Sequence, residues 1–143
     1  MDGGAGSAGA GAGRSVLMTM LRVLDPGSAD AVERLCELIV PGSGRAGPVV
    51  YVDAVLAEMP PPVREQALEA IDKLAPAAEQ GTEALAEYER TPEFALVRAL
   101  AVEAFYSDFV APGAEGPGAW AEIDFNTPLA RRLAKDWSYL GIA

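Results

Sequence analysis

Prolines and glycines divide this chain of 143 residues into short segments, and their spacing constrains the fold more than any other feature of the sequence. Between them, apolar residues recur every three or four positions, which is the period of a helix with one buried face. No stretch alternates apolar and polar residues for long enough to predict a strand. We therefore predict an all-α fold, a compact array of about five or six short helices joined by proline-marked turns.

Capping residues and prolines indicate where the helices start and end. The first three expected helices run from Ala29 to Val40 with Ser28 as N-cap, from Pro48 up to the Pro60–Pro62 run, and from Pro62 to a break or kink near Ala75 caused by Pro76. A helix-prone stretch from Ala77 to Arg90 follows, interrupted at Gly81–Thr82, where Thr82 caps a fresh turn. The last two run from Glu93 to about Phe109 behind the Thr91–Pro92 start signal, and from Leu129 to about Asp136. The apolar residues of the helix from Glu93 do not keep to one stripe. This helix is therefore expected at the centre, surrounded by other helices or by a partner.

Residues 1–15 are mostly Gly, Ala and Ser, which offer little to bury, so we expect a flexible arm followed by a single domain over residues 16–143. The net charge of −10 argues against nucleic acid and anionic membrane surfaces as partners, although it also serves solubility. No apolar stretch is long enough to span a bilayer, and only Arg14 precedes the first apolar run. A cytoplasmic protein without membrane insertion is expected.

Catalytic chemistry has few candidate residues, because the chain contains no histidine and one cysteine, Cys36. Cys36 lies at helical spacing from Val32 and Ile39, which predicts a place in the core. Carboxylates flank a glycine-rich loop at Glu103, Asp108, Glu115, Glu122 and Asp124, so a small carboxylate-dependent enzyme remains an alternative. With 21 acidic residues, chance proximity explains such a cluster as well. We therefore predict no catalytic residue.

The segment Gly42–Gly47 is close to a G-x-G-x-x-G pattern, but it follows a predicted helix rather than a strand. A turn between helices is the expected structure. The acidic spacing between Glu115 and Asp124 does not match a calcium loop. We therefore expect no cofactor site and no metal site within this chain.

Aromatic residues gather toward the end of the sequence. Both Trp, three of the four Tyr and all four Phe lie between Tyr88 and the C-terminus. Aromatic side chains are enriched in interface cores, so the pattern indicates a docking surface, although the same residues would also build a core. The predicted interface residues are Phe105, Tyr106, Trp120, Phe125, Trp137, Tyr139 and Leu140.

Three segments together resemble the small-subunit family (subunit 3) of gluconate 2-dehydrogenase and related flavoprotein sugar dehydrogenases. The first is Leu38–Gly42, an apolar pair before Pro-Gly, followed by Tyr51–Asp53. The second is the apolar segment Phe94–Phe109 before the glycine-rich loop. The third is the terminal Trp137–Gly141.

The resemblance implies a non-catalytic accessory subunit of a larger oxidoreductase of the glucose-methanol-choline type, acting on a sugar, glycoside or related alcohol. FAD and the histidine base would then belong to the large subunit of this heteromer. Many members carry a twin-arginine export signal, whereas residues 1–15 contain a single arginine, Arg14, and the segment Ala119–Arg132 has no clear counterpart in the family. A free-standing helical adaptor for another protein is the alternative.

Overall fold

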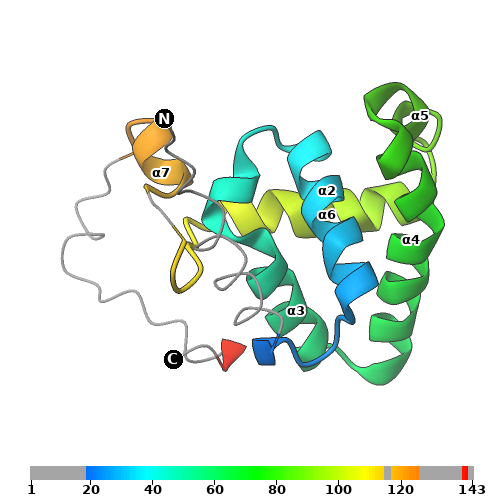
Figure 1. Ribbon diagram of the computed structural model, residues 1–143, viewed down its shortest axis with the longest axis horizontal. Coiled ribbons are helices and arrows are strands. Elements are labelled where there is room, and N and C mark those ends of the chain that lie inside the picture. Colours follow the sequence, from blue (N-terminus) through cyan, green and yellow to red (C-terminus); the bar gives the residue numbers. More distant parts are fainter. Residues whose placement is uncertain (1–18, 115–116, 126–139, 142–143) are drawn as a thin grey trace, which may run out of the picture.

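The structure is a computed structural model that describes residues 19–114, 117–125 and 140–141. Within these residues every regular element is helical (Figure 1). The elements are α2 (Pro26–Ile39), the 3₁₀ helix η1 (Ser43–Ala46), α3 (Pro48–Glu58), α4 (Pro61–Gln80), α5 (Thr82–Ala86), α6 (Pro92–Tyr106) and α7 (Ala119–Glu122). The predicted all-α fold is confirmed. The arm over residues 1–15 and the helix predicted from Leu129 to Asp136 lie outside the described residues.

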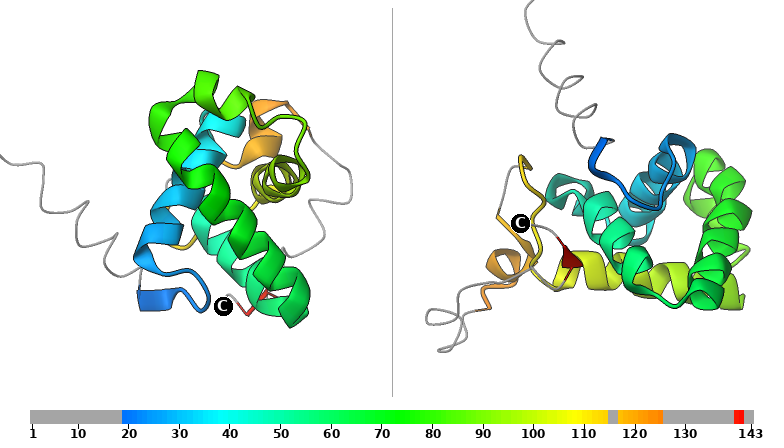
Figure 2. Two further views of the ribbon diagram at one scale, coloured as in Figure 1. Left: turned by 90° about the vertical axis from the view of Figure 1, so that its right-hand side faces the viewer. Right: turned by 90° about the horizontal axis from the view of Figure 1, so that it is seen from below.

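Helix α6 packs against α2, α3 and α4, and these contacts bury its residues Val97, Leu100, Ala101, Ala104 and Phe105. Figure 2 shows these three helices on one side of α6. The opposite face of α6 is exposed, including Ala95, Ala99, Val102 and Tyr106. The predicted central helix is thus surrounded on one side only.

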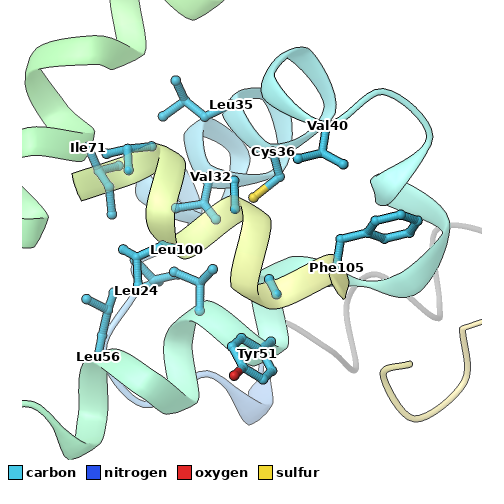
Figure 3. Packing of buried hydrophobic residues seen from close by; sticks show 14 of the residues in the cluster. Leu24, Val32, Leu35, Cys36, Val40, Tyr51, Leu56, Ile71, Leu100 and Phe105 are labelled. Carbon is cyan, nitrogen blue, oxygen red and sulfur yellow. The ribbon is translucent and has the colours of Figure 1, made fainter. Parts of the chain in front are cut away.

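The core joins apolar faces of all four long helices (Figure 3). Leu35 of α2, Leu56 of α3 and Leu74 of α4 are completely buried. Cys36 lies in this core, as predicted, and burial raises the pKa of its thiol to about 12. The thiol is therefore protonated at neutral pH and packs as a small apolar group.

Prolines open α2, α3, α4 and α6, where a backbone N–H would have no partner within the helix. Thr91 caps α6 as predicted, since its hydroxyl accepts the N–H of Phe94 at 3.2 Å. The prediction for the first helix was wrong in its cap, because α2 begins at Pro26 and Asp25 accepts the N–H of Ser28 at 2.8 Å. Asp25 is therefore the N-cap, and Ser28 lies within the first turn of the helix.

Two expectations about helix boundaries further along the chain were also wrong. Pro76 does not end α4, which continues to Gln80 with Ala77 and Ala78 buried. Packing of this helix on α2 and α6 stabilises the turn that the proline weakens. Thr82 is not a cap but the first residue of α5, whose N-cap position is Gly81.

A buried carboxylate fixes the first described segment to the bundle. Asp53 of α3 is 3% exposed and accepts the backbone N–H groups of Arg22, Val23 and Leu24 at 2.8 to 2.9 Å. The Arg22 guanidinium donates in turn to the carbonyl of Leu140 at 2.7 Å. The described residues near both ends of the chain therefore meet beside α3 (Figure 1).

Candidate protein-binding surface

Large apolar side chains are left exposed where α6 ends and α7 begins. Tyr106 is 48% exposed, Ile123 59% and Phe125 48%, and the half-buried Trp120 lies between them. The rings of Trp120 and Phe125 meet edge to face with centroids 5.3 Å apart. We call Tyr106, Trp120, Ile123 and Phe125 the aromatic patch.

Hydrogen bonds hold the aromatic patch together. The indole N–H of Trp120 donates to the carbonyl of Tyr106 at 2.9 Å, which joins α7 to the last turn of α6. The backbone N–H of Phe125 donates to the carbonyl of Trp120, also at 2.9 Å. The exposed rings are therefore attached to a fixed backbone.

Asp108 positions α7 against α6. Its backbone has a φ of 63°, in the left-handed region that Asp adopts more readily than most residues, and the chain turns sharply there after Tyr106. This turn explains why α6 ends three residues before the predicted Phe109. The residue Asp108 is 9% exposed, and its carboxylate accepts the backbone N–H of Trp120 at 3.1 Å. It thereby fixes the first turn of α7.

An ion pair fixes α7 from its other side. Nη2 of Arg45 in η1 lies 2.9 Å from Oε2 of Glu122, and the guanidinium also stacks over the ring of Phe105 at 5.3 Å. The hydrogen bond from Arg45 lowers the pKa of the Glu122 carboxyl, so the carboxylate is the favoured form. The ion pair thus joins η1 to α7, two segments that lie far apart in the sequence.

The structure brings together three of the seven predicted interface residues, Tyr106, Trp120 and Phe125. It places Phe105 and Leu140 in the core, at 2% and 3% exposed. A partner cannot reach these two side chains without rearranging the chain. Trp137 and Tyr139 lie outside the described residues.

Ile123 and Val102 extend the surface but were missed by sequence reasoning. Both are exposed, Ile123 in the patch and Val102 one helical turn before Tyr106. The sequence signal used was aromatic content, which does not report aliphatic residues. Ile123 could have been predicted, because it lies between Trp120 and Phe125 in the sequence.

The acidic residues flanking the glycine loop have separate tasks in the structure. Glu103 accepts the hydroxyl of Tyr51 at 2.8 Å, Asp108 accepts a backbone N–H, and Glu122 pairs with Arg45. Asp124 has a φ of 51° in the turn after α7. Among the described residues, no group of three or more His, Cys, Asp or Glu side chains is placed to hold a metal ion. Glu115 lies outside the described residues.

A mostly apolar hollow lies beside η1, lined by Leu21, Ala29, Pro48 and Val49, with Glu33 and Arg45 at its wall. Both charged side chains already interact with other groups of the chain. The walls of the hollow are therefore mainly apolar, and its two charged side chains are already engaged elsewhere in the chain.

In the part of the chain that the structure describes, no helix is both long and apolar enough to cross a membrane. Comparison of the chain with protein-family models, with curated proteins and with solved structures gives no match.

Proposed function

We propose that this chain is a non-catalytic accessory subunit that binds a larger FAD-dependent oxidoreductase of the glucose-methanol-choline type, and stabilises or matures it in the cytoplasm. The partner carries the flavin and acts on a sugar, glycoside or related alcohol. The observation that carries the binding role is the aromatic patch, in which large apolar side chains are exposed on a fixed backbone. The resemblance of three sequence segments to the subunit 3 family supplies the class of partner.

The aromatic patch has the physical properties of an interface core. Tyr and Trp provide large contact areas with few rotatable bonds, and such residues account for most of the binding energy in many interfaces. Backbone and indole hydrogen bonds already fix Trp120 and Phe125, so little conformational freedom is lost when a partner covers them. This preorganisation supports binding as the role of the patch.

Charge at the edge of the patch supports a partner surface with basic groups. Glu122 and Asp124 lie within the same short segment as Ile123 and Phe125, and the whole chain carries a net charge of −10. Complementary potentials speed up association and disfavour wrong partners. We therefore expect apolar side chains with neighbouring Lys or Arg on the flavoprotein.

The test is to purify the tagged chain from the cells that naturally produce it and to measure the flavin absorbance that copurifies. Phe125→Asp and Ile123→Asp place a charge in the patch and are expected to remove the flavoprotein from the eluate. Val63→Asp is the matched control, since Val63 is 43% exposed and lies on α4, far from α7 (Figure 1). It should retain the flavoprotein.

Three results would contradict the proposal. If the tagged wild-type chain captures no flavin-bearing protein, it has another function. If it captures a protein without flavin, the result favours the helical adaptor. Equal retention by Phe125→Asp and Val63→Asp would show that a flavoprotein binds elsewhere. Circular dichroism of each variant shows whether the helices remain intact.

A further inference from the structure

The exposed face of α6 carries a coiled-coil pattern. Pro92, Ala95, Ala99, Val102 and Tyr106 follow one another at spacings of three, four, three and four residues, and all five are exposed. This is the spacing of the a and d positions of a heptad, with Pro92, Ala99 and Tyr106 at a. We call these five residues the α6 stripe. The remaining faces of α6 are covered by its own chain, so the stripe is the side open to another helix.

Charged residues border the α6 stripe on both sides. Arg98 precedes Ala99 and occupies a g position, while Glu103 follows Val102 and occupies an e position. Both residues are exposed. Arg98 forms no ion pair with another described residue, so its guanidinium is available to a partner. Glu103 accepts the Tyr51 hydroxyl, and a carboxylate has further acceptor sites for a second donor.

Arg98 and Glu103 are spaced so that two copies of α6 can pair with each other. In a parallel pair of helices, a g residue faces the e residue that lies five positions further along the other helix. Arg98 and Glu103 have this separation, so two copies of α6 in parallel place Arg98 of each against Glu103 of the other. In an antiparallel pair g residues face g residues and e residues face e residues, so Arg98 and Glu103 could not pair with each other.

We propose that a second copy of this chain covers the α6 stripe, in a two-fold symmetric dimer with the two α6 helices parallel. Ala95 and Ala99 are small enough to let the helix backbones approach closely, and Val102 and Tyr106 pack against their symmetry mates. The seam is short, so the dimer is a weak one that dissociates on dilution.

This inference goes beyond the proposed accessory role and does not rest on it. The α6 stripe shares only Tyr106 with the aromatic patch, and Trp120, Ile123 and Phe125 belong to the segment around α7. A flavoprotein can therefore contact α7 whether or not the chain is dimeric. Phe125→Asp is expected to abolish flavoprotein binding and to leave the dimer intact, which separates the two proposals.

Sedimentation equilibrium of the full chain at physiological salt, at concentrations up to about 1 mM, tests the dimer. The wild type is expected to reach the dimer mass. Arg98→Glu and Glu103→Arg each place two like-charge contacts in the seam and should weaken association roughly tenfold. The double exchange Arg98→Glu/Glu103→Arg restores both pairs and should recover the wild-type affinity within about threefold.

Matched variants on α4 control for net charge. Arg64→Glu and Glu65→Arg change the charge as the single seam variants do and are expected to leave association unchanged. Thermal melts of every variant show whether loss of the Tyr51–Glu103 hydrogen bond disturbs the fold. A wild type that stays monomeric over this range overturns the proposal, as does a double exchange that associates no better than the single variants.

A cysteine at Ala99 reports the helix direction. Equivalent a residues face each other across the axis of a parallel pair, so Ala99→Cys should form an intermolecular disulfide under mild oxidation. The native Cys36 is buried and does not compete. Cysteine at exposed Ala86 on α5 is the control and should give little cross-linked dimer. Equal cross-linking at both sites would overturn the parallel arrangement.

Discussion

The carboxylate of Asp108 fills the space where residue 118 would carry a side chain. A Cβ atom on Gly118 would stand 2.2 Å from Oδ1 of Asp108 and 3.0 Å from its Cγ. The same Oδ1 accepts the N–H of Trp120. Close approach of the Gly118 backbone is therefore what allows Asp108 to position α7 and, with it, the aromatic patch.

Gly118→Ala is expected to displace the Asp108 carboxylate and to break its hydrogen bond to Trp120. The expected loss of stability is about 1 to 3 kcal/mol, the range for forcing an atom into a packed site. Urea denaturation measures this loss, and near-ultraviolet circular dichroism follows the surroundings of Trp120. Gly27→Ala is the control, because its Cβ would meet Asp25 at an ordinary 3.4 Å. Unchanged stability in Gly118→Ala would mean that Asp108 does not hold α7.

Asp108 itself combines two properties that substitutions can separate. Asn tolerates the left-handed backbone and keeps an oxygen that can accept the Trp120 N–H, whereas Ala keeps neither advantage. We expect Asp108→Asn to stay within about 1 kcal/mol of the wild type, and Asp108→Ala to lose about 1 to 3 kcal/mol. Chemical denaturation of the two variants side by side provides the comparison. Equal losses would assign the effect to charge rather than to the hydrogen bond.

Local sequence signals predicted much of the fold. The Thr91–Pro92 signal predicted a helix from Glu93, and α6 begins at Pro92. Pro48 was predicted to open the preceding helix, and α3 begins at Pro48. Pro76 was misread because its tolerance depends on the packing of α4 against helices from elsewhere in the chain. Propensity describes a helix in isolation, and tertiary contacts override it.

The candidate surface was harder to predict, because its geometry depends on contacts between distant segments. The sequence indicated that Trp120 and Phe125 belong to an interface, but it also assigned Phe105, whose ring lies beneath Arg45 in the structure. Arg45 reaches Glu122, 77 residues further along the chain. The role of Asp53 was missed for the same reason, since its three donors lie about thirty residues away.

Asp53→Ala is expected to be strongly destabilising. The substitution leaves the N–H groups of Arg22, Val23 and Leu24 without their acceptor, and an unpaired buried donor costs about 1 to 3 kcal/mol. We expect a loss of about 3 kcal/mol or more in urea denaturation, or failure to fold. Asp72→Ala, on the exposed side of α4, serves as control and should change stability by about 0.5 kcal/mol or less. A mild effect of Asp53→Ala would show that water replaces the carboxylate.

The Arg45–Glu122 pair predicts a dependence on pH confined to acid. The hydrogen bond from Arg45 lowers the pKa of Glu122 below its ordinary value of 4.5 in the folded chain. A lowered folded pKa means that the contribution of the pair is complete above the ordinary value, and that it is lost as the pH falls through the folded one. NMR titration of the Glu122 carboxyl carbon should give a midpoint below 4.5, and Arg45→Gln should move that midpoint upward. Lys73→Gln, which removes the partner of Glu93 instead, should leave Glu122 unchanged while raising the pKa of Glu93. If Arg45→Gln leaves the Glu122 midpoint where it was, the pair does not persist in solution, and α7 is held by Asp108 and the Trp120 indole alone.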